Sequence, residues 1–200
     1  MSRTEVEAII ERELPEMPGW CGVEKGKRMA ELSYEAALCV ELGVFGGRGL
    51  VAMSLALADQ GFGRADGIDP YEARASLEGT NAPENDAWWG GLDYEAIARV
   101  AQMKICALGL FHHTRLVRVP SREVVAYYVN ESIDVFHLDA NHSEETSRED
   151  VALWAPKIKP GGYWVFDDTD WSTTQKAQQD LEALGFKMLE DHVQWKVYRK

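Results

Sequence analysis

The chain has 200 residues, of which 46% are hydrophobic and 27% charged, so it can bury a core and is neither disordered nor fibrous. At roughly 150 residues per domain, this length allows one domain, expected over 1–200, but not two. Acidic residues outnumber basic ones by 33 to 21, and the resulting net charge of −12 disfavours binding to nucleic acid and to anionic membrane surfaces.

The predicted compartment follows from hydropathy and cysteine content. No apolar run approaches the roughly 20 residues that a membrane span requires, and the first residues lack the apolar core of a signal peptide. The three cysteines, Cys21, Cys39 and Cys106, are odd in number and scattered, which indicates reduced thiols rather than disulfides or a zinc site. We therefore expect a cytoplasmic protein.

The chain alternates between helical and strand patterns. In chain order, the expected elements are helices over 4–14 and 23–37, a strand over 38–42, a helix over 50–60, a strand over 65–69, a helix over 93–108, a strand over 115–119, a helix over 121–128, a strand over 133–139, a helix over 143–154, a strand over 162–168, a helix over 173–184 and a hairpin over 186–189 and 193–198. The strands are apolar on both faces, which predicts an open, largely parallel α/β sheet with helices on both sides.

The segment 71–92 interrupts this alternation, because its glycines, its proline and its Trp88-Trp89 pair follow no clear period. A loop of this length inside a compact domain is usually functional or mobile. We expect an inserted, lid-like loop here. Trp88 and Trp89 would either close over an apolar substrate or anchor an inserted lobe to the core, and the sequence favours neither.

Ligands of such sheets bind at the carboxyl ends of the strands, so the residues there are the candidates for function. The first strand ends in Glu41-Leu42-Gly43-Val44-Phe45-Gly46-Gly47, whose glycines let a backbone pass close to a ligand. The spacing fits neither a dinucleotide fingerprint nor a phosphate loop, and it also suits an ordinary tight turn. Asp69 ends the second strand, where an acidic residue commonly accepts hydrogen bonds from ribose hydroxyls; an Asp-Pro turn is the alternative.

Carboxylates end two strands that are expected to be neighbours. Asp139 ends one of them, and Asp167 and Asp168 end the next. Because adjacent strands lie less than about 5 Å apart, the three carboxylates would share one small site. Like charges this close are costly unless a cation neutralises them, and hard oxygen ligands suit Mg²⁺. The alternative is that Asp167 and Asp168 begin a loop and face water.

Two further residues lie near these strand ends. His142 follows Asp139 by three positions, and it would be either a general base beside the metal or a histidine satisfied by backbone at the start of a helix. Ser121 opens the helix after the third strand, and it would either cap that helix or touch the adenine of a ligand.

Four motifs in this order resemble class I S-adenosylmethionine-dependent methyltransferases, and within them the metal-dependent O-methyltransferases of the catechol, macrocin and cephalosporin-biosynthesis type. The motifs lie at 41–47, 67–70, 138–143 and 159–168. The segment 23–27 also resembles the stretch that precedes the core in that group, so the likeness covers about 22–198. It implies a Rossmann-like, doubly wound, mostly parallel seven-stranded sheet with a C-terminal antiparallel hairpin, preceded by N-terminal helices within 1–37.

The resemblance also implies roles for single residues. Glu41, Gly43, Phe45 and Gly47 would hold the methionine part of S-adenosylmethionine, Asp69 its ribose, and Ser121 and Arg122 would border its adenine. Asp139, Asp167 and Asp168 would bind Mg²⁺ or another divalent cation, with Asp139 and His142 as the catalytic residues and His142 as the base. Asn141 departs from the pattern, since some sugar O-methyltransferases carry an aspartate base there.

The expected activity is divalent-metal-assisted O-methylation of a small hydroxylated molecule, such as a sugar or a phenolic natural product. A metal that holds the acceptor hydroxyl would lower its pKa and orient it for in-line attack. Two alternatives stay open, a metal-independent methyltransferase and an inactive cofactor-binding module of the same fold. The expected partner is a small-molecule acceptor, with no nucleic acid and no membrane, and assembly into a homo-oligomer stays open.

Overall fold

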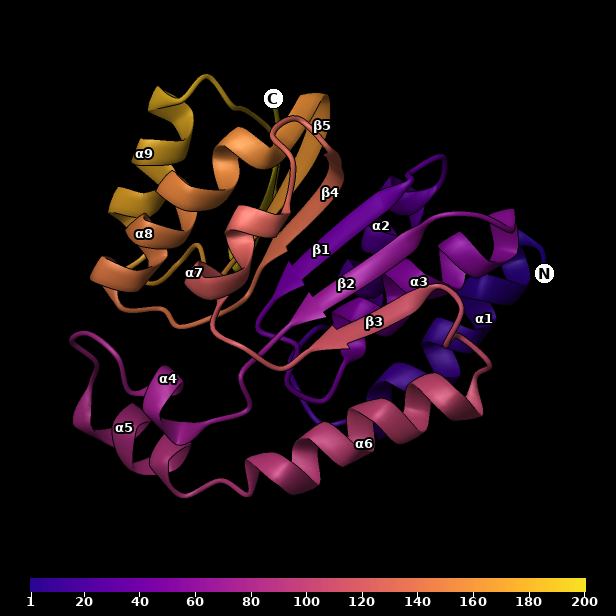
Figure 1. Cartoon of the computed structure of the whole chain (residues 1–200), viewed down its shortest axis with the longest axis horizontal. Helices are drawn as coiled ribbons and strands as arrows, with labels where there is room; N and C mark the ends of the chain where they lie inside the picture. Colours follow the sequence, from indigo (N-terminus) through magenta and orange to yellow (C-terminus); the bar gives the residue numbers. More distant parts are fainter.

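The computed structural model describes all 200 residues and contains one seven-stranded sheet with helices on both faces (Figure 1). The strands are β1 (Leu38–Leu42), β2 (Arg64–Ile68), β3 (Thr114–Val117), β4 (Ile133–Leu138), β5 (Ile158–Asp167), β6 (Lys187–Asp191) and β7 (Trp195–Arg199). They lie in the order β3-β2-β1-β4-β5-β7-β6; the first five are parallel, and β7 runs antiparallel to both of its neighbours. The expected doubly wound sheet with its C-terminal hairpin is confirmed.

Two hydrophobic clusters, one on each face of the sheet, hold the helices. Helices α1 (Arg3–Glu13), α2 (Val23–Ser33), α3 (Arg48–Gln60) and α6 (Tyr94–Ala107) supply the first, and α7 (Ser121–Val124), α8 (Glu144–Trp154) and α9 (Gln175–Ala183) supply the second. Short 3₁₀ turns follow α1, α7 and α8, at η1 (Leu14–Glu16), η2 (Val125–Tyr127) and η3 (Ala155–Lys157). No helix combines the length and the apolar character that crossing a membrane requires.

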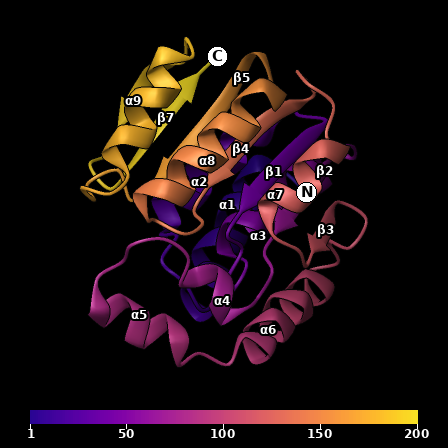
Figure 2. The ribbon, with the colours of Figure 1, turned by 60° about the vertical axis from the view of Figure 1, so that its left-hand side comes forward.

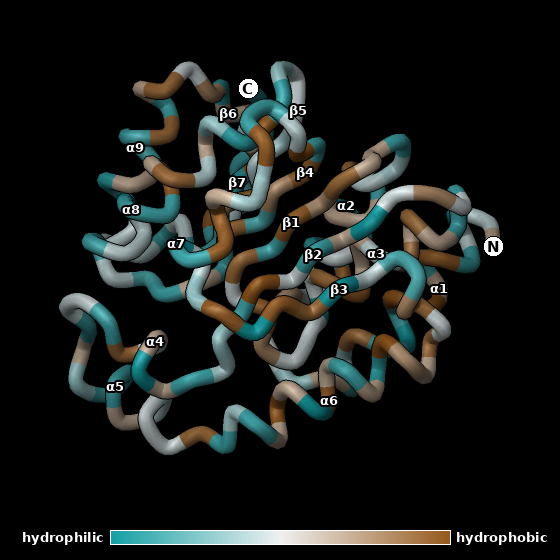
Figure 3. The backbone as a smooth tube through the Cα atoms, in the orientation of Figure 1, coloured by the Kyte–Doolittle hydropathy of each residue, from teal (hydrophilic) through white to brown (hydrophobic).

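The pleat of the strands decides which face each side chain occupies. Cys39 belongs to the first cluster and its neighbour Val40 to the second, because successive side chains of a strand point to opposite faces. The hydropathy colouring of Figure 3 shows β1 as a largely apolar stretch at the centre of the sheet. A strand covered on both faces is apolar throughout, as the sequence pattern indicates.

The same alternation carries polar side chains to one face at the strand ends. Glu41 of β1 and His137 of β4 are partners in the parallel register. Asp139 follows His137 by two positions, and Asp167 follows Val165 of the first cluster by two. All four polar residues therefore point toward the layer that contains α2 and α3.

The segment 71–92, expected as an inserted, lid-like loop, contains two short helices that the sequence pattern did not indicate. They are α4 (Ala73–Ser76) and α5 (Pro83–Gly90). Pro83 opens α5, and Glu84 and Asp86 lie in its first turn, all of which favour a helix start. Both helices lie beyond the carboxyl ends of β1 and β2, where the arrowheads point (Figures 1 and 2). The segment is therefore placed to cover that edge of the sheet.

Two predicted boundaries were also wrong by several residues. Strand β5 begins at Ile158 rather than at the expected residue 162, because Ile158 pairs with Ile133 across a register shift. Helix α2 ends at Ser33, and Tyr34 already has extended backbone angles. Both differences reflect sheet pairing and packing that local sequence patterns do not contain.

The turn after β1 predicts a large effect for Gly43→Ala. Gly43 has φ +81°, and a Cβ there would lie 1.9 Å from the backbone oxygen of Asp139. Gly109 is the matched control, since it has φ +69° and no atom within 4 Å of a Cβ. We expect Gly109→Ala to lower the free energy of unfolding by about 1–2 kcal/mol, and Gly43→Ala to lower it by roughly 2 kcal/mol more. Urea denaturation measures both, and equal losses would contradict the close approach.

Candidate active site

Two adjoining cavities lie at the carboxyl ends of the parallel strands. The smaller has a volume of about 130 Å³, and its wall includes Asp69, Ser121 and Arg122. The larger has a volume of about 740 Å³, and its wall includes Glu41, Asp167 and Asp168. Gly43, Phe45, Asp139 and His142 border both cavities. All of the predicted site residues except Gly47 border one or both cavities at this edge of the sheet.

Gly47 lies in the expected turn but faces away from the cavities. It is the N-cap of α3 with φ +91°, and a Cβ there would lie 3.3 Å from the Cβ of Ala101 in α6. Because Gly47 has no side chain, the turn can approach α6 closely. Phe45, two positions earlier, also has a positive φ, of 47°, which an L-residue adopts only when its surroundings impose it.

Asp69 ties the glycine turn to the chain that follows β2. One carboxylate oxygen accepts hydrogen bonds from the amides of Val44 and Phe45 at 3.0 and 2.9 Å, and the other accepts one from the amide of Tyr71 at 2.7 Å. Burial raises the pKa of Asp69, although these amide hydrogen bonds act in the opposite direction. The carboxylate fixes the backbone on both sides of the smaller cavity and lies on the cavity wall.

A buried pair, Glu41 and His137, lies beneath the larger cavity. Glu41 Oε1 and His137 Nδ1 are 2.8 Å apart, while Glu41 Oε2 and His137 Nε2 have no hydrogen-bond partner. Burial raises the pKa of Glu41 well above its usual value and lowers that of His137 well below its own. His137 is absent from the sequence prediction, although the signal is visible there as a histidine inside an apolar strand, two positions before Asp139.

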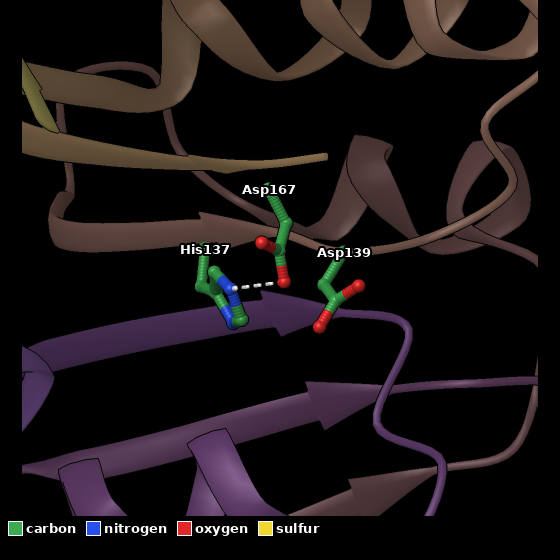
Figure 4. Close-up of side chains that lie close together, drawn as sticks. All are labelled: His137, Asp139 and Asp167. Carbon is green, nitrogen blue, oxygen red and sulfur yellow. Dashed lines mark ion pairs between the residues drawn. The ribbon is translucent and has the colours of Figure 1, made fainter. Parts of the chain in front are cut away.

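The carboxylates at the ends of β4 and β5 surround a lysine. The ammonium of Lys25, from α2, contacts Asp167 and lies 3.9 Å from Asp139 Oδ2. His137 Nε2 lies 3.9 Å from Asp167 Oδ2, the oxygen that Lys25 contacts (Figure 4). Burial raises the pKa of Asp139 to about 7, with the charge of Asp167 adding to it. Burial would also raise the pKa of Asp167, but the charge and the hydrogen bond of Lys25 outweigh burial and hold that pKa low.

His142 is paired with two of the predicted metal ligands. Its Nε2 lies 3.0 Å from Asp168 Oδ2 and 3.8 Å from Asp139 Oδ1. Burial lowers the pKa of His142, but the nearby carboxylates of Asp139 and Asp168 outweigh burial and raise it to about 10. With this pKa the ring of His142 is protonated and cannot accept a proton. His142 can act as the predicted base only when Asp139 and Asp168 bind another group and no longer raise its pKa.

The donor set suits a hard divalent cation. Two groups each bring three ligand atoms within 4.8 Å of one another, His137 with Asp139 and Asp167, and Asp139 with His142 and Asp168. Asp139 is common to both groups, whereas Asp167 and Asp168 fall into different ones. Asp168 has φ +49°, a strained angle that sets its side chain apart from that of Asp167. Carboxylate oxygens are the ligands that Mg²⁺ prefers, so the residues fit that ion.

Ser121 and Arg122 contact residues that close the smaller cavity. Ser121 Oγ donates a hydrogen bond to Asp150 Oδ1 at 2.6 Å, and Arg122 donates to both carboxylate oxygens of Glu78 at 2.6 and 3.0 Å. The cap of α7 is Pro120 with no side-chain hydrogen bond, so Ser121 does not cap the helix. Both residues lie on the cavity wall.

Asn141 fastens the 71–92 segment over the strand ends. Its side-chain amide donates to the carbonyl oxygens of Ala75, Ser76 and Glu78 at 2.9–3.0 Å. Its own oxygen accepts from the amide of Ser143 at 2.8 Å and from Thr146. Asn141, which was predicted to stand where some sugar O-methyltransferases carry an aspartate base, here links the 71–92 segment to the start of α8.

The fold and the site together define a class of protein. A doubly wound sheet with a glycine turn after β1, an acidic residue after β2 and carboxylates after β4 and β5 is that of a class I S-adenosylmethionine-dependent methyltransferase. A family model described as a methyltransferase domain matches residues 40–169, which is more than half of the chain. The chain belongs to this methyltransferase family. No curated protein sequence matches it.

Solved structures with the same fold cover nearly all of the chain. The O-methyltransferase TomG from Streptomyces achromogenes is 15% identical, with a TM-score of 0.61, covering 100% of this chain and 88% of TomG. An S-adenosylmethionine-dependent O-methyltransferase from Thermotoga maritima is 12% identical, with a TM-score of 0.65, covering 97% and 70%. A protein from Corynebacterium glutamicum is 17% identical, with a TM-score of 0.64, covering 98% and 89%. At these identities the likeness concerns the fold.

Asn141→Asp should loosen the 71–92 segment. The change removes the donors to three carbonyl oxygens and places a negative charge against them, which costs roughly 1–3 kcal/mol. We expect faster proteolysis and faster amide exchange in 71–92, with the rest of the sheet protected as before. Glu145→Gln is the control, because Glu145 only accepts longer hydrogen bonds, of 3.3–3.4 Å, from Thr80 at the surface. Unchanged protection of 71–92 in Asn141→Asp would show that Asn141 does not fasten the segment.

Asp150→Asn should make the free energy of unfolding less dependent on pH. Burial raises the pKa of Asp150 to about 7, although the hydrogen bond from Ser121 lowers it. The folded chain therefore keeps a proton that an unfolded aspartate, with a pKa of about 3.9, releases, and stability falls between about pH 4 and pH 7. We expect Asp150→Asn to gain stability over the wild type as the pH rises to 8, by at most about 4 kcal/mol. Urea denaturation at pH 4.5 and 8 tests this, and an equal difference at both values would contradict it.

Proposed function

We propose that the enzyme transfers a methyl group from S-adenosylmethionine to a hydroxyl group of a small molecule, assisted by a divalent cation. The observation that carries the proposal is the position of the Asp139, Asp167 and Asp168 carboxylates in the wall of the larger cavity, beside the glycine turn. TomG and the Thermotoga maritima protein are both O-methyltransferases, which supports oxygen as the acceptor atom.

In this proposal the smaller cavity binds the nucleoside part of the cofactor and the larger cavity binds the acceptor. Asp69, Ser121 and Arg122 would bind the ribose and adenine of the cofactor at the smaller cavity. Its methionine part would lie past Gly43 and Phe45, which border both cavities, so that the sulfonium methyl faces the larger one. Opening of the 71–92 segment would admit the cofactor, since a cavity of about 130 Å³ is smaller than the usual 300–1,000 Å³ of a ligand site.

The chemistry requires alignment and a deprotonated nucleophile. Asp139, Asp167 and Asp168 would hold a divalent ion such as Mg²⁺, which, when bound, lowers the pKa of an acceptor hydroxyl and orients it. The acceptor oxygen forms a bond to the methyl carbon as the bond from that carbon to sulfur breaks, which leaves a neutral thioether. The hydroxyl proton would pass to the ring of His142, which can accept it once Asp139 and Asp168 no longer hold that ring protonated.

Aromatic side chains favour a ring-bearing acceptor. Five of the seven tryptophans line the larger cavity, namely Trp20, Trp88, Trp89, Trp171 and Trp195. Trp88 and Trp89 are 4.7 Å apart between ring centroids, and both contact Trp20 and Phe45. Flat faces of this kind stack on a phenol or on the apolar face of a sugar. The Trp88-Trp89 pair lines the substrate cavity and also packs against the glycine turn.

A metal-independent methyltransferase is the second candidate, and Lys25 is the observation that favours it. Its ammonium already supplies a positive charge among the carboxylates.

The dependence of methylation on a divalent ion distinguishes the two candidates. Methylation of a catechol or a methyl glycoside, followed as release of S-adenosylhomocysteine, should stop in EDTA and resume with Mg²⁺ under the leading proposal. It should continue in EDTA under the second.

Cofactor binding is the first test of the whole proposal. Calorimetric titration with S-adenosylhomocysteine should give micromolar affinity, and Asp69→Ala should weaken it at least about tenfold, or 1.4 kcal/mol. Asp180→Ala is the control, because Asp180 pairs with Arg148 at the surface. Asp69→Asn, which keeps an acceptor oxygen for the turn, replaces the alanine variant if that one does not fold. Absence of binding to the wild type would remove the methyltransferase proposal, and unchanged affinity in both Asp69 variants would remove Asp69 from the ribose site.

A further inference from the structure

Lys25 reaches the acidic site from outside the sheet. It lies in the first turn of α2, and its side chain is 5% exposed, with the ammonium against Asp167 and 3.9 Å from Asp139 Oδ2. Lysine is rarely buried unless it is paired, because removing its charge from water costs several kcal/mol. The burial of Lys25 is therefore explained by these two carboxylates.

The helix itself does not account for this position. Lys25 is at the third residue of α2, where the positive end of the helix dipole disfavours a cation. Lys27, in the same helix, points outward to Glu11 and Glu24, and its side chain is 25% exposed. The Nε2 of His137 has no hydrogen-bond partner and lies 3.9 Å from Asp167 Oδ2, which is beyond hydrogen-bond distance. Lys25 is the full positive charge that reaches Asp167 directly.

We propose that Lys25 is a built-in counter-cation that competes with a divalent metal ion for the oxygens of Asp139 and Asp167. In the metal-free chain its ammonium offsets the repulsion between the two carboxylates and holds them together. A divalent ion that binds the same oxygens must displace the ammonium or tolerate it at close range, which weakens metal binding. This inference rests on the metal site of the proposed function.

Two opposite consequences of removing the charge follow. A neutral residue leaves the carboxylates uncompensated, so the metal-free chain becomes less stable. The same change makes the site more negative and frees its oxygens, so a divalent ion binds more tightly. A lysine that only supported the fold would produce the first effect without the second, which makes metal affinity the decisive readout.

The test uses Lys25→Met, which keeps the aliphatic stem of lysine and removes its charge. Mn²⁺, a hard cation that carboxylates bind, is titrated by calorimetry into the full-length wild type and variant, and thermal unfolding is followed in EDTA and in Mn²⁺. We expect the variant to bind Mn²⁺ at least about tenfold more tightly, a difference of 1.4 kcal/mol. Its melting temperature should be lower than that of the wild type in EDTA and should rise more on addition of Mn²⁺.

Two matched variants complete the design. Lys25→Arg keeps the charge and should bind Mn²⁺ as weakly as the wild type. Lys27→Met removes an exposed charge from the same helix and should change neither the affinity nor the melting temperature in EDTA beyond small amounts. Lys25→Gln, measured in the same way, replaces the methionine variant if that one does not fold in EDTA.

The outcomes separate this inference from the proposed function. Equal or weaker Mn²⁺ binding by Lys25→Met, beside clear binding by the wild type, would overturn the role of Lys25 and leave the metal site standing. Binding by the variant alone would support Lys25 as the occupant of the site. Absence of Mn²⁺ binding by both proteins would overturn both the inference and metal assistance, while binding of S-adenosylhomocysteine would still report on the methyltransferase itself.

Discussion

The site depends on carboxylates that the fold brings together, partly buried, at the ends of β4 and β5. Asp139 and Asp167 lie close to each other, and like charges this close are costly without a nearby cation. Lys25 supplies one from α2, and His142 supplies another beside Asp168. The acidic edge is therefore held by charges that come from two different layers of the molecule, and any ion or substrate that enters must rearrange those contacts.

The sheet delivers these side chains to one place through its register and its pleat. Glu41 and His137 face each other across β1 and β4, and Asp139 continues on the same face two positions later. A shift of a single residue in either strand would turn the set toward the opposite helices. Gly43 secures the arrangement, because the backbone of Asp139 passes where its side chain would be.

The 71–92 segment connects the site to the rest of the surface. Asn141 and Arg122 fasten it over the smaller cavity, while its two tryptophans extend into the wall of the larger one. One inserted segment thus covers the expected cofactor site and shapes the expected acceptor site. Tyr71 and Trp89 anchor the segment to the first cluster, whereas helix α5 has no buried residue. Few buried contacts are typical of a part that opens at modest free-energy cost.

The sequence by itself determined the succession of strands and helices along the chain outside 71–92, the doubly wound sheet and the candidate site residues at the strand ends. Apolar runs, glycine turns and strand-end carboxylates are local patterns, so the sequence shows them directly. Tertiary structure alone decided that Lys25 enters the acidic site, that His137 pairs with Glu41, that Asn141 fastens the inserted segment and that Gly47 faces α6. These contacts join residues far apart in the chain. Their partners are set by helix packing and strand register, and no spacing within a single segment encodes them.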